Sequence, residues 1–270
     1  ASRLACKSPV RLGFGCSFLE VLLMEAFSFA QSPYPIRDDI PQAYRNFWQR
    51  LASPGSWWTG DERVAIAQES RSALKCQFCI DRKSELSPYT FKGEHSHDGK
   101  LPATAVDAAH HIITDQGRIT RAWIENNSDS GLSKEAYVEL VGIVVAVFSI
   151  DEFHRALGLD LEPLPEPMPG EVSRYRPAHI SEDMGFVPTV PPDGAVGNES
   201  DLWEGSRGAN VIRALTLVPD ALRDWREIAA AQYLSFQRMT NFVQDDNRSI
   251  NRMQMELVAG RVAAINECYY

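Results

Sequence analysis

Residues 133–158 read SKEAYVELVGIVVAVFSIDEFHRALG, and this stretch decides the fold class. Its apolar residues recur at helical spacing from Tyr137 to Phe153, and for two turns they cover nearly the whole circumference of the expected helix. A helix that is apolar on all sides is typical of the buried centre of a protein. We therefore expect a long central helix that begins after Ser133 and stops at Gly158.

The rest of the chain carries helical patterns, and strand patterns are scarce, so the sequence predicts an all-α fold. Thr59 and Glu62 are spaced as a capping box, in which the two residues satisfy each other's backbone amides at the start of a helix. Apolar residues keep helical spacing from there to Phe78, which predicts one helix that continues through the cysteines at 76 and 79. A further amphipathic helix is expected over residues 102–114.

The sequence predicts two repeats joined by a connector. Residues 161–192 are rich in proline, and such a segment is extended because proline cannot continue a helix. On its two sides, residues 40–46 (IPQAYRN) resemble residues 218–224 (VPDALRD), and each copy leads into a helix that ends in a cysteine. Agreement in order and spacing indicates a duplication. The expected divisions are a leader or fragment edge (1–23), a first repeat (24–160), the connector (161–205) and the beginning of a second repeat (206–270).

Composition excludes several classes of protein. The formal net charge of −9 over 270 residues provides no basic surface for nucleic acid. The longest apolar run, residues 140–150, is far shorter than the roughly 20 residues of a membrane-spanning helix. The five cysteines are an odd number without a regular framework, which argues against a disulfide-stabilised secreted scaffold. A reducing compartment, the cytoplasm, is the expected location.

Cys76 and Cys79 form a CxxC motif, and two thiols at this spacing can cycle to a disulfide. Glu69 lies seven residues earlier, two helical turns back, and is a candidate proton acceptor for Cys76. Basic residues that favour the reactive thiolate surround the motif: Arg71, Lys75, Arg82 and Lys83. The alternative interpretation is a solvated helix face on which Glu69 is an ordinary surface carboxylate.

Residues 252–268 (RMQMELVAGRVAAINEC) place Glu256 twelve residues before Cys268. This stretch resembles the AhpD-like alkylhydroperoxidase and carboxymuconolactone decarboxylase superfamily. Its members carry an acidic residue, a helix of small residues and then a CxxC motif, usually with a histidine one turn later. The resemblance implies that Glu256 is a proton relay and Cys268 the first cysteine of a second redox centre. It extends more loosely over most of residues 35–158 and 210–270.

The alkylhydroperoxidase-related selenoproteins are the group that the chain resembles most. In that group the second cysteine of the C-terminal motif is often selenocysteine, so the resemblance implies selenocysteine or cysteine directly after Tyr270, and a second repeat truncated at that motif. It further implies an AhpD-like helical protein that forms homo-oligomers. The implied activity is a thiol- or selenol-dependent peroxidase or disulfide oxidoreductase that reduces hydroperoxides and is reset by a thiol reductant or a redox partner protein. No other cofactor is expected.

The first repeat departs from the family pattern at two positions. Lys83 occupies the place of the histidine after the CxxC motif, and Val64 occupies the place of the glutamate before it. If the first dithiol is active, Glu69 together with His111 or His154 could replace the usual relay. The first repeat could equally be structural, and we favour the second centre as the site of the chemistry.

Two other functions stay open at this point. A lactone decarboxylase of the same superfamily needs no dithiol. A non-catalytic oligomeric scaffold could use the CxxC motif structurally or bind zinc, with His95 and His97 as further ligands to Cys76 and Cys79. Glycines flank these histidines, so a polar loop is the simpler interpretation, and no metal is predicted.

Overall fold

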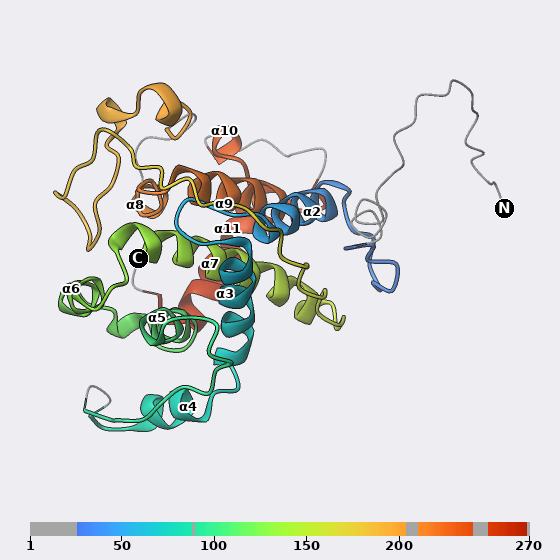
Figure 1. The fold of residues 1–270 in the computed structure, drawn as a ribbon. Helices are drawn as coiled ribbons and strands as arrows, with labels where there is room; N and C mark the ends of the chain where they lie inside the picture. Colours follow the sequence, from blue (N-terminus) through green and yellow to red (C-terminus); the bar gives the residue numbers. More distant parts are fainter. Residues whose placement is uncertain (1–25, 88–89, 204–209, 240–247, 269–270) are drawn as a thin grey trace, which may run out of the picture.

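The computed structural model describes residues 26–87, 90–203, 210–239 and 248–268 (Figure 1). These parts of the chain form α-helices and short 3-10 helices, and their only β pairing is an isolated antiparallel bridge between Ser181 and Thr189. The prediction of an all-α fold is confirmed. The expected leader, residues 1–23, lies outside the described residues.

The helices of the described chain are α2 (Asp39–Ala52), α3 (Gly60–Ala73), α4 (Gln77–Ser84), α5 (Ala103–Thr114), η1 (Gln116–Arg118), α6 (Arg121–Asp129), α7 (Lys134–Ala156), η2 (Pro192–Gly194), η3 (Gly197–Glu199), α8 (Asn210–Arg213), α9 (Pro219–Gln232), α10 (Phe236–Met239) and α11 (Arg252–Ile265). The connections between them include two long ones, residues 85–102 between α4 and α5 and the proline-rich segment after α7.

Helix α7 is the central helix that the sequence predicts. The Ser133 side chain caps its first turn by accepting a hydrogen bond from the Ala136 amide at 3.2 Å. Gly158 follows its last turn with φ of 69°, a left-handed conformation that favours glycine. Helices α3, α5 and α9 pack around α7, and side chains such as Leu140 and Val147 are fully buried. Helix α7 therefore positions the helices that carry the candidate site.

Helices α2 and α9 begin at the two similar segments and pack against each other, as Figure 1 shows. The Arg50 guanidinium on α2 binds Asp224 at 2.5 Å and Glu227 at 2.6 Å on α9. Buried apolar residues from both sides of the connector belong to one core cluster. The similar segments thus contact each other within one core, and the duplication itself stays a prediction.

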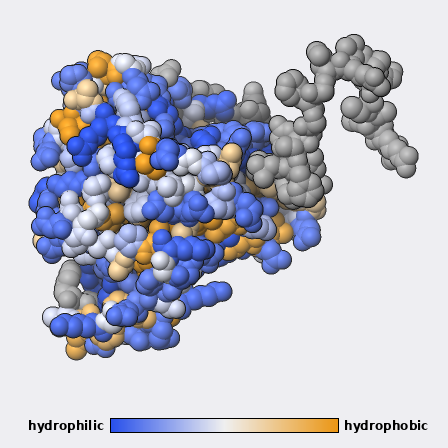
Figure 2. Space-filling model, in the orientation of Figure 1, coloured by the Kyte–Doolittle hydropathy of each residue, from blue (hydrophilic) through white to orange (hydrophobic). Residues whose placement is uncertain are grey.

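The proline-rich segment contains no helix up to Pro191, as predicted; its first part lies against α2, and its second part turns back on itself where Ser181 pairs with Thr189. The Trp48 indole donates a hydrogen bond to the Pro163 carbonyl at 2.8 Å, and the Met168 amide donates one to the Ala52 carbonyl at 2.8 Å. On the face drawn in Figure 2, hydrophilic residues predominate and apolar residues form small separate groups. Within the described parts of the chain, every helix is too short or too polar to cross a bilayer.

The contact between α7 and α9 depends on Gly142. A Cβ atom at this position would lie 2.8 Å from the Ala221 Cβ atom, so a larger side chain must push the helices apart. We expect Gly142→Val to lower the free energy of unfolding by about 1–3 kcal/mol, the usual cost of overpacking a core. Urea denaturation followed by circular dichroism measures this change. Gly260→Ala on α11, where no atom lies within 4 Å of the new Cβ, is the matched control and should not destabilise the protein.

Candidate active site

The CxxC motif lies at the beginning of a helix and not within one. Helix α3 ends at Ala73, the amides of Lys75 and Cys76 bond to carbonyls three residues back, and α4 begins at Gln77. The prediction of one helix through both cysteines is therefore wrong. Cys76 is the N-cap residue of α4, and Cys79 lies in its first turn. Both thiols are buried, and the positive end of the helix dipole favours the thiolate there.

The loop after α4 places His95 against the two sulfurs. The His95 Nδ1 atom lies 3.4 Å from the Cys79 Sγ atom and 3.6 Å from the Cys76 Sγ atom. The imidazole ring packs edge-on against Phe78, with 4.9 Å between ring centroids. Gly93 allows this close approach, because a Cβ atom there would lie 2.5 Å from the Phe78 ring. The loop conformation thus places one imidazole against both thiols.

His110 on α5 contacts Cys79 from the other side. Its Nδ1 atom lies 3.3 Å from the Cys79 Sγ atom, and its Nε2 atom lies 3.1 Å from the Glu69 carboxylate on α3. The His110 side chain is fully buried. Glu69 therefore reaches the dithiol through His110, and not along one face of a helix as the sequence suggested. Packing of α5 on α3 creates this chain of three groups.

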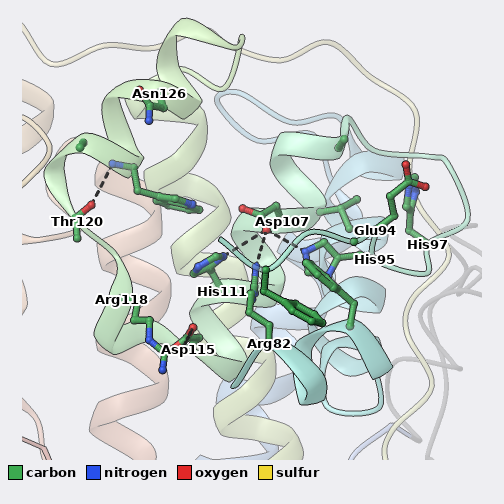
Figure 3. Close-up of a pocket in the computed structure, with 17 residues that line it drawn as sticks. Arg82, Glu94, His95, His97, Asp107, His111, Asp115, Arg118, Thr120 and Asn126 are labelled. Carbon is green, nitrogen blue, oxygen red and sulfur yellow. Dashed lines mark hydrogen bonds and ion pairs between the residues drawn. The ribbon is translucent and has the colours of Figure 1, made fainter. Parts of the chain in front are cut away.

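Asp107 joins His95 to the surrounding basic side chains (Figure 3). Its Oδ1 atom lies 2.9 Å from the His95 Nε2 atom, 3.2 Å from the Arg82 guanidinium and 3.4 Å from the His111 Nδ1 atom. The second Arg82 nitrogen is 4.0 Å from the Cys79 sulfur. Of the basic residues that surround the motif in sequence, Arg82 contacts the dithiol, whereas Arg71 binds Asp151.

The surroundings give the two imidazoles different protonation states. Burial opposes protonation of His95, but its hydrogen bond to Asp107 and its contacts with the two thiols raise its pKa to about 10. Burial and the charge on His95 lower the pKa of His110 to about 3. Because Glu69 lies against Nε2, a neutral His110 keeps its proton on that atom and turns the Nδ1 lone pair toward Cys79.

The thiol and carboxyl groups are shifted as well. Burial disfavours the Cys76 thiolate, but hydrogen bonds with the Cys79 backbone and with His95 outweigh this effect and lower the pKa of Cys76. Burial raises the pKa of Glu69. The site therefore combines a more acidic thiol, a cationic imidazole and a neutral imidazole backed by a carboxyl group.

A cleft of about 750 Å³ adjoins the dithiol. Phe78, Phe91 and Trp123 contribute aromatic walls, and Asp107 and His95 contribute polar ones (Figure 3). The sulfurs lie behind His95, which both borders the cleft and contacts the two thiols. His95 therefore connects the cleft with the dithiol.

His111 and His154, the histidines that the sequence singled out, do not contact the sulfurs. His111 lies beside Asp107 and packs on Trp123, with 5.0 Å between ring centroids. The His154 Nδ1 atom donates a hydrogen bond to the Ile150 carbonyl at 2.9 Å, and the ring lies among aromatic side chains that include Phe27. His110 and His95 occupy the positions next to the dithiol instead.

The residues of the proposed second centre lie on α11 and just beyond its end. Glu256 on α11 accepts hydrogen bonds from the Tyr233 hydroxyl and the Arg252 guanidinium. Cys268 is exposed just beyond α11, whereas Cys76 and Cys79 are buried. The role of Glu256 and Cys268 stays a prediction, and residues 269–270 lie outside the described chain.

Sequence reasoning missed His110 and Asp107. Both lie on one face of α5, three residues apart, a spacing typical of side chains that act together on a helix. The pattern was visible, but nothing in the sequence places that face against Cys79. Together with Cys76 and His95, the residues Cys79 and His110 also form a group whose ligand atoms lie within 4.8 Å of one another, as a metal ion requires.

In comparisons with known proteins, the sequence matches no protein-family model, no curated protein and no solved structure.

Proposed function

We propose that this protein is a thiol-dependent oxidoreductase that reduces hydroperoxides through Cys76 and Cys79. The observation that carries the proposal is the set of partners around the dithiol, in which Cys76 contacts His95, Cys79 contacts His95 and His110, and each imidazole is backed by a carboxyl group. This arrangement supports the first centre as the site of chemistry, whereas the sequence favoured the second. The AhpD-like family membership is part of the same proposal.

Cys76 is the attacking thiol in this scheme. It occupies the N-cap position of α4, at the positive end of the helix dipole, and hydrogen-bonds with His95, and both features favour its thiolate. The thiolate attacks one oxygen of the hydroperoxide, the O–O bond breaks, and Cys76 becomes a sulfenic acid. The released alkoxide takes a proton from the His95 imidazolium and leaves as an alcohol. The aromatic walls of the cleft suit the organic part of such a substrate.

Cys79 then resolves the sulfenic acid. His95 has lost its charge in the first step and no longer opposes protonation of His110, so the His110 Nδ1 atom accepts the Cys79 proton, and the resulting thiolate attacks the Cys76 sulfur. An S–S bond forms, and the hydroxide that leaves takes the proton to become water. Glu69 stabilises the transient charge on His110 through its contact with Nε2. An external dithiol returns two electrons and two protons to reset the pair.

The test is disulfide formation in the reduced protein. Addition of one equivalent of cumene hydroperoxide should yield a Cys76–Cys79 disulfide that peptide mass spectrometry detects, and one equivalent of alcohol. Cys76→Ser should form no disulfide, and Cys79→Ser should stop at the sulfenic acid, which dimedone traps.

Two results would contradict the proposal. Unchanged peroxide consumption by the Cys76→Ser/Cys79→Ser double variant would place the chemistry elsewhere. Oxidation of the exposed Cys268 with an intact Cys76–Cys79 dithiol would point to the C-terminal centre.

A further inference from the structure

We propose that the reduced centre also binds one zinc ion, with Cys76, Cys79, His95 and His110 as its four ligands. The ligand atoms of these residues lie within 4.8 Å of one another. Two thiolates and two imidazoles are among the commonest ligand sets of tetrahedral zinc in proteins. The inference goes beyond peroxide reduction and does not depend on it.

The distances fit a tetrahedral ion. Zinc–sulfur and zinc–nitrogen bonds of about 2.3 and 2.0–2.1 Å at tetrahedral angles place sulfur and nitrogen about 3.6 Å apart. The Cys79 Sγ atom lies 3.3 Å from His110 Nδ1 and 3.4 Å from His95 Nδ1, and the Cys76 Sγ atom lies 3.6 Å from His95 Nδ1. The four side chains therefore need only small movements to surround one ion.

Both imidazoles are oriented as zinc ligands usually are. A histidine ligand commonly donates its second N–H to a carboxylate, which fixes the tautomer and strengthens the ligand. His110 contacts Glu69 through Nε2 at 3.1 Å, and His95 contacts Asp107 through Nε2 at 2.9 Å. In each case the Nδ1 atom is left to face the sulfurs. Two independent carboxyl–imidazole pairs thus converge on one point.

The ligand set differs from the one that the sequence suggested. His97, two residues after His95, is exposed and accepts a hydrogen bond from the Gly99 amide at 3.1 Å. His110 on α5 takes the place of this loop residue. The two histidine ligands are consequently fifteen residues apart, outside the three-to-five-residue spacing that marks most zinc motifs in a sequence.

Four protein ligands close the coordination sphere and leave no open position for a substrate. The zinc ion and the disulfide need the same two sulfurs, so they exclude each other. Zinc bound here would hold the dithiol in its reduced form and shield it from alkylating agents and peroxides. Binding releases protons, because both sulfurs coordinate as thiolates and His95 coordinates as a neutral imidazole that has given up its Nδ1 proton.

Metal titration of the full chain tests the inference. The protein is reduced with a phosphine, freed of metal, and titrated with Co²⁺ and then with Zn²⁺. We expect one Co²⁺ per chain, with the visible absorption of tetrahedral cobalt and a thiolate-to-cobalt charge-transfer band, and displacement of the cobalt by one Zn²⁺. Glu69→Gln should weaken zinc binding about 10- to 100-fold, the usual effect of removing a carboxylate behind a histidine ligand.

Variants of the two candidate histidines separate the ligand sets. His110→Ala should lose tetrahedral cobalt, and His97→Ala, the matched control, should bind like the wild type. Two results would overturn the proposal: octahedral cobalt without the charge-transfer band in the wild type, or an equal loss of cobalt binding in the His110→Ala and His97→Ala variants.

The wild-type protein gives a readout that does not depend on the folding of a variant. One equivalent of Zn²⁺ should protect Cys76 and Cys79 from iodoacetamide and leave the exposed Cys268 reactive. If iodoacetamide alkylates Cys76 and Cys79 at the same rate with zinc as without it, the inference is refuted. Zinc is added to reduced protein without peroxide, so a failure of zinc to protect the thiols leaves the peroxidase proposal standing. Likewise, a failure of metal-free protein to form the disulfide with peroxide leaves the zinc proposal standing.

Discussion

Replacement of His110 by glutamine is expected to slow formation of the Cys76–Cys79 disulfide by about 100- to 10,000-fold, the usual contribution of a general acid–base group. The physical reason is that His110 Nδ1 lies 3.3 Å from the Cys79 sulfur and accepts its proton in the resolving step. Stopped-flow mixing of reduced, metal-free protein with hydroperoxide, with quenching by acid and thiol alkylation, measures the rate. Attack by Cys76 should be affected much less, so sulfenic acid should accumulate in the variant.

The neighbouring histidine provides the control. His111 lies on the same helix and contacts Asp107 and not a sulfur, so His111→Gln should have a much smaller effect on the same rate. Equal slowing in the two variants would favour the assignment of His111 that the sequence suggested. If His110→Gln folds poorly, Glu69→Gln tests the relay instead. This variant removes the carboxylate behind His110 and keeps the histidines that contact the sulfurs. Thermal unfolding of each variant shows whether the fold is kept.

Replacement of Arg63 by methionine is expected to lower the free energy of unfolding by about 3–5 kcal/mol, because it leaves a buried carboxylate without its partner. The Arg63 guanidinium on α3 binds the Glu139 carboxylate on α7, and their side chains are 8% and 2% exposed. Glu139 also accepts a hydrogen bond from the Trp57 amide at 2.6 Å. Burial raises the pKa of Glu139 although Arg63 opposes this shift, so the acid is costly to keep ionised once Arg63 is lost.

Urea denaturation at neutral pH measures this loss. The control is the more exposed pair Lys134–Glu125, with side chains 22% and 45% exposed, where Lys134→Met should cost no more than about 1 kcal/mol. The double variant Arg63→Met/Glu139→Leu should regain most of the stability, because it removes both buried charges. If Arg63→Met lowers the free energy of unfolding no more than Lys134→Met does, the buried ion pair does not hold α3 on α7.

The helices could be predicted because their signals are local. Thr59 and Glu62 form the predicted capping box at the start of α3, and Ser133 and Gly158 bound the central helix as expected. Helix caps and apolar periodicity act within one or two turns, so they can be read without the rest of the molecule. The same reasoning failed at Cys76, where a periodic apolar pattern continues although the backbone breaks between α3 and α4.

The candidate site was predicted only in part. The CxxC motif and Glu69 are among the residues that meet at the site, but the link between them is His110, and the histidines expected there lie elsewhere. His110 is 31 residues from Cys79 and 41 from Glu69 in the chain. Contacts at such separations depend on how α5 packs on α3, which no local pattern encodes.

The sequence by itself determined the all-helical class, the central helix, the non-helical proline-rich segment and the dithiol, because each depends on residues that are close together in the chain. Only the tertiary structure decided that Cys76 caps a helix, that His95 and His110 face the sulfurs, and that Asp107 and Glu69 lie behind them. The reason is that buried polar side chains take whichever partners the packing of apolar helix faces brings within reach.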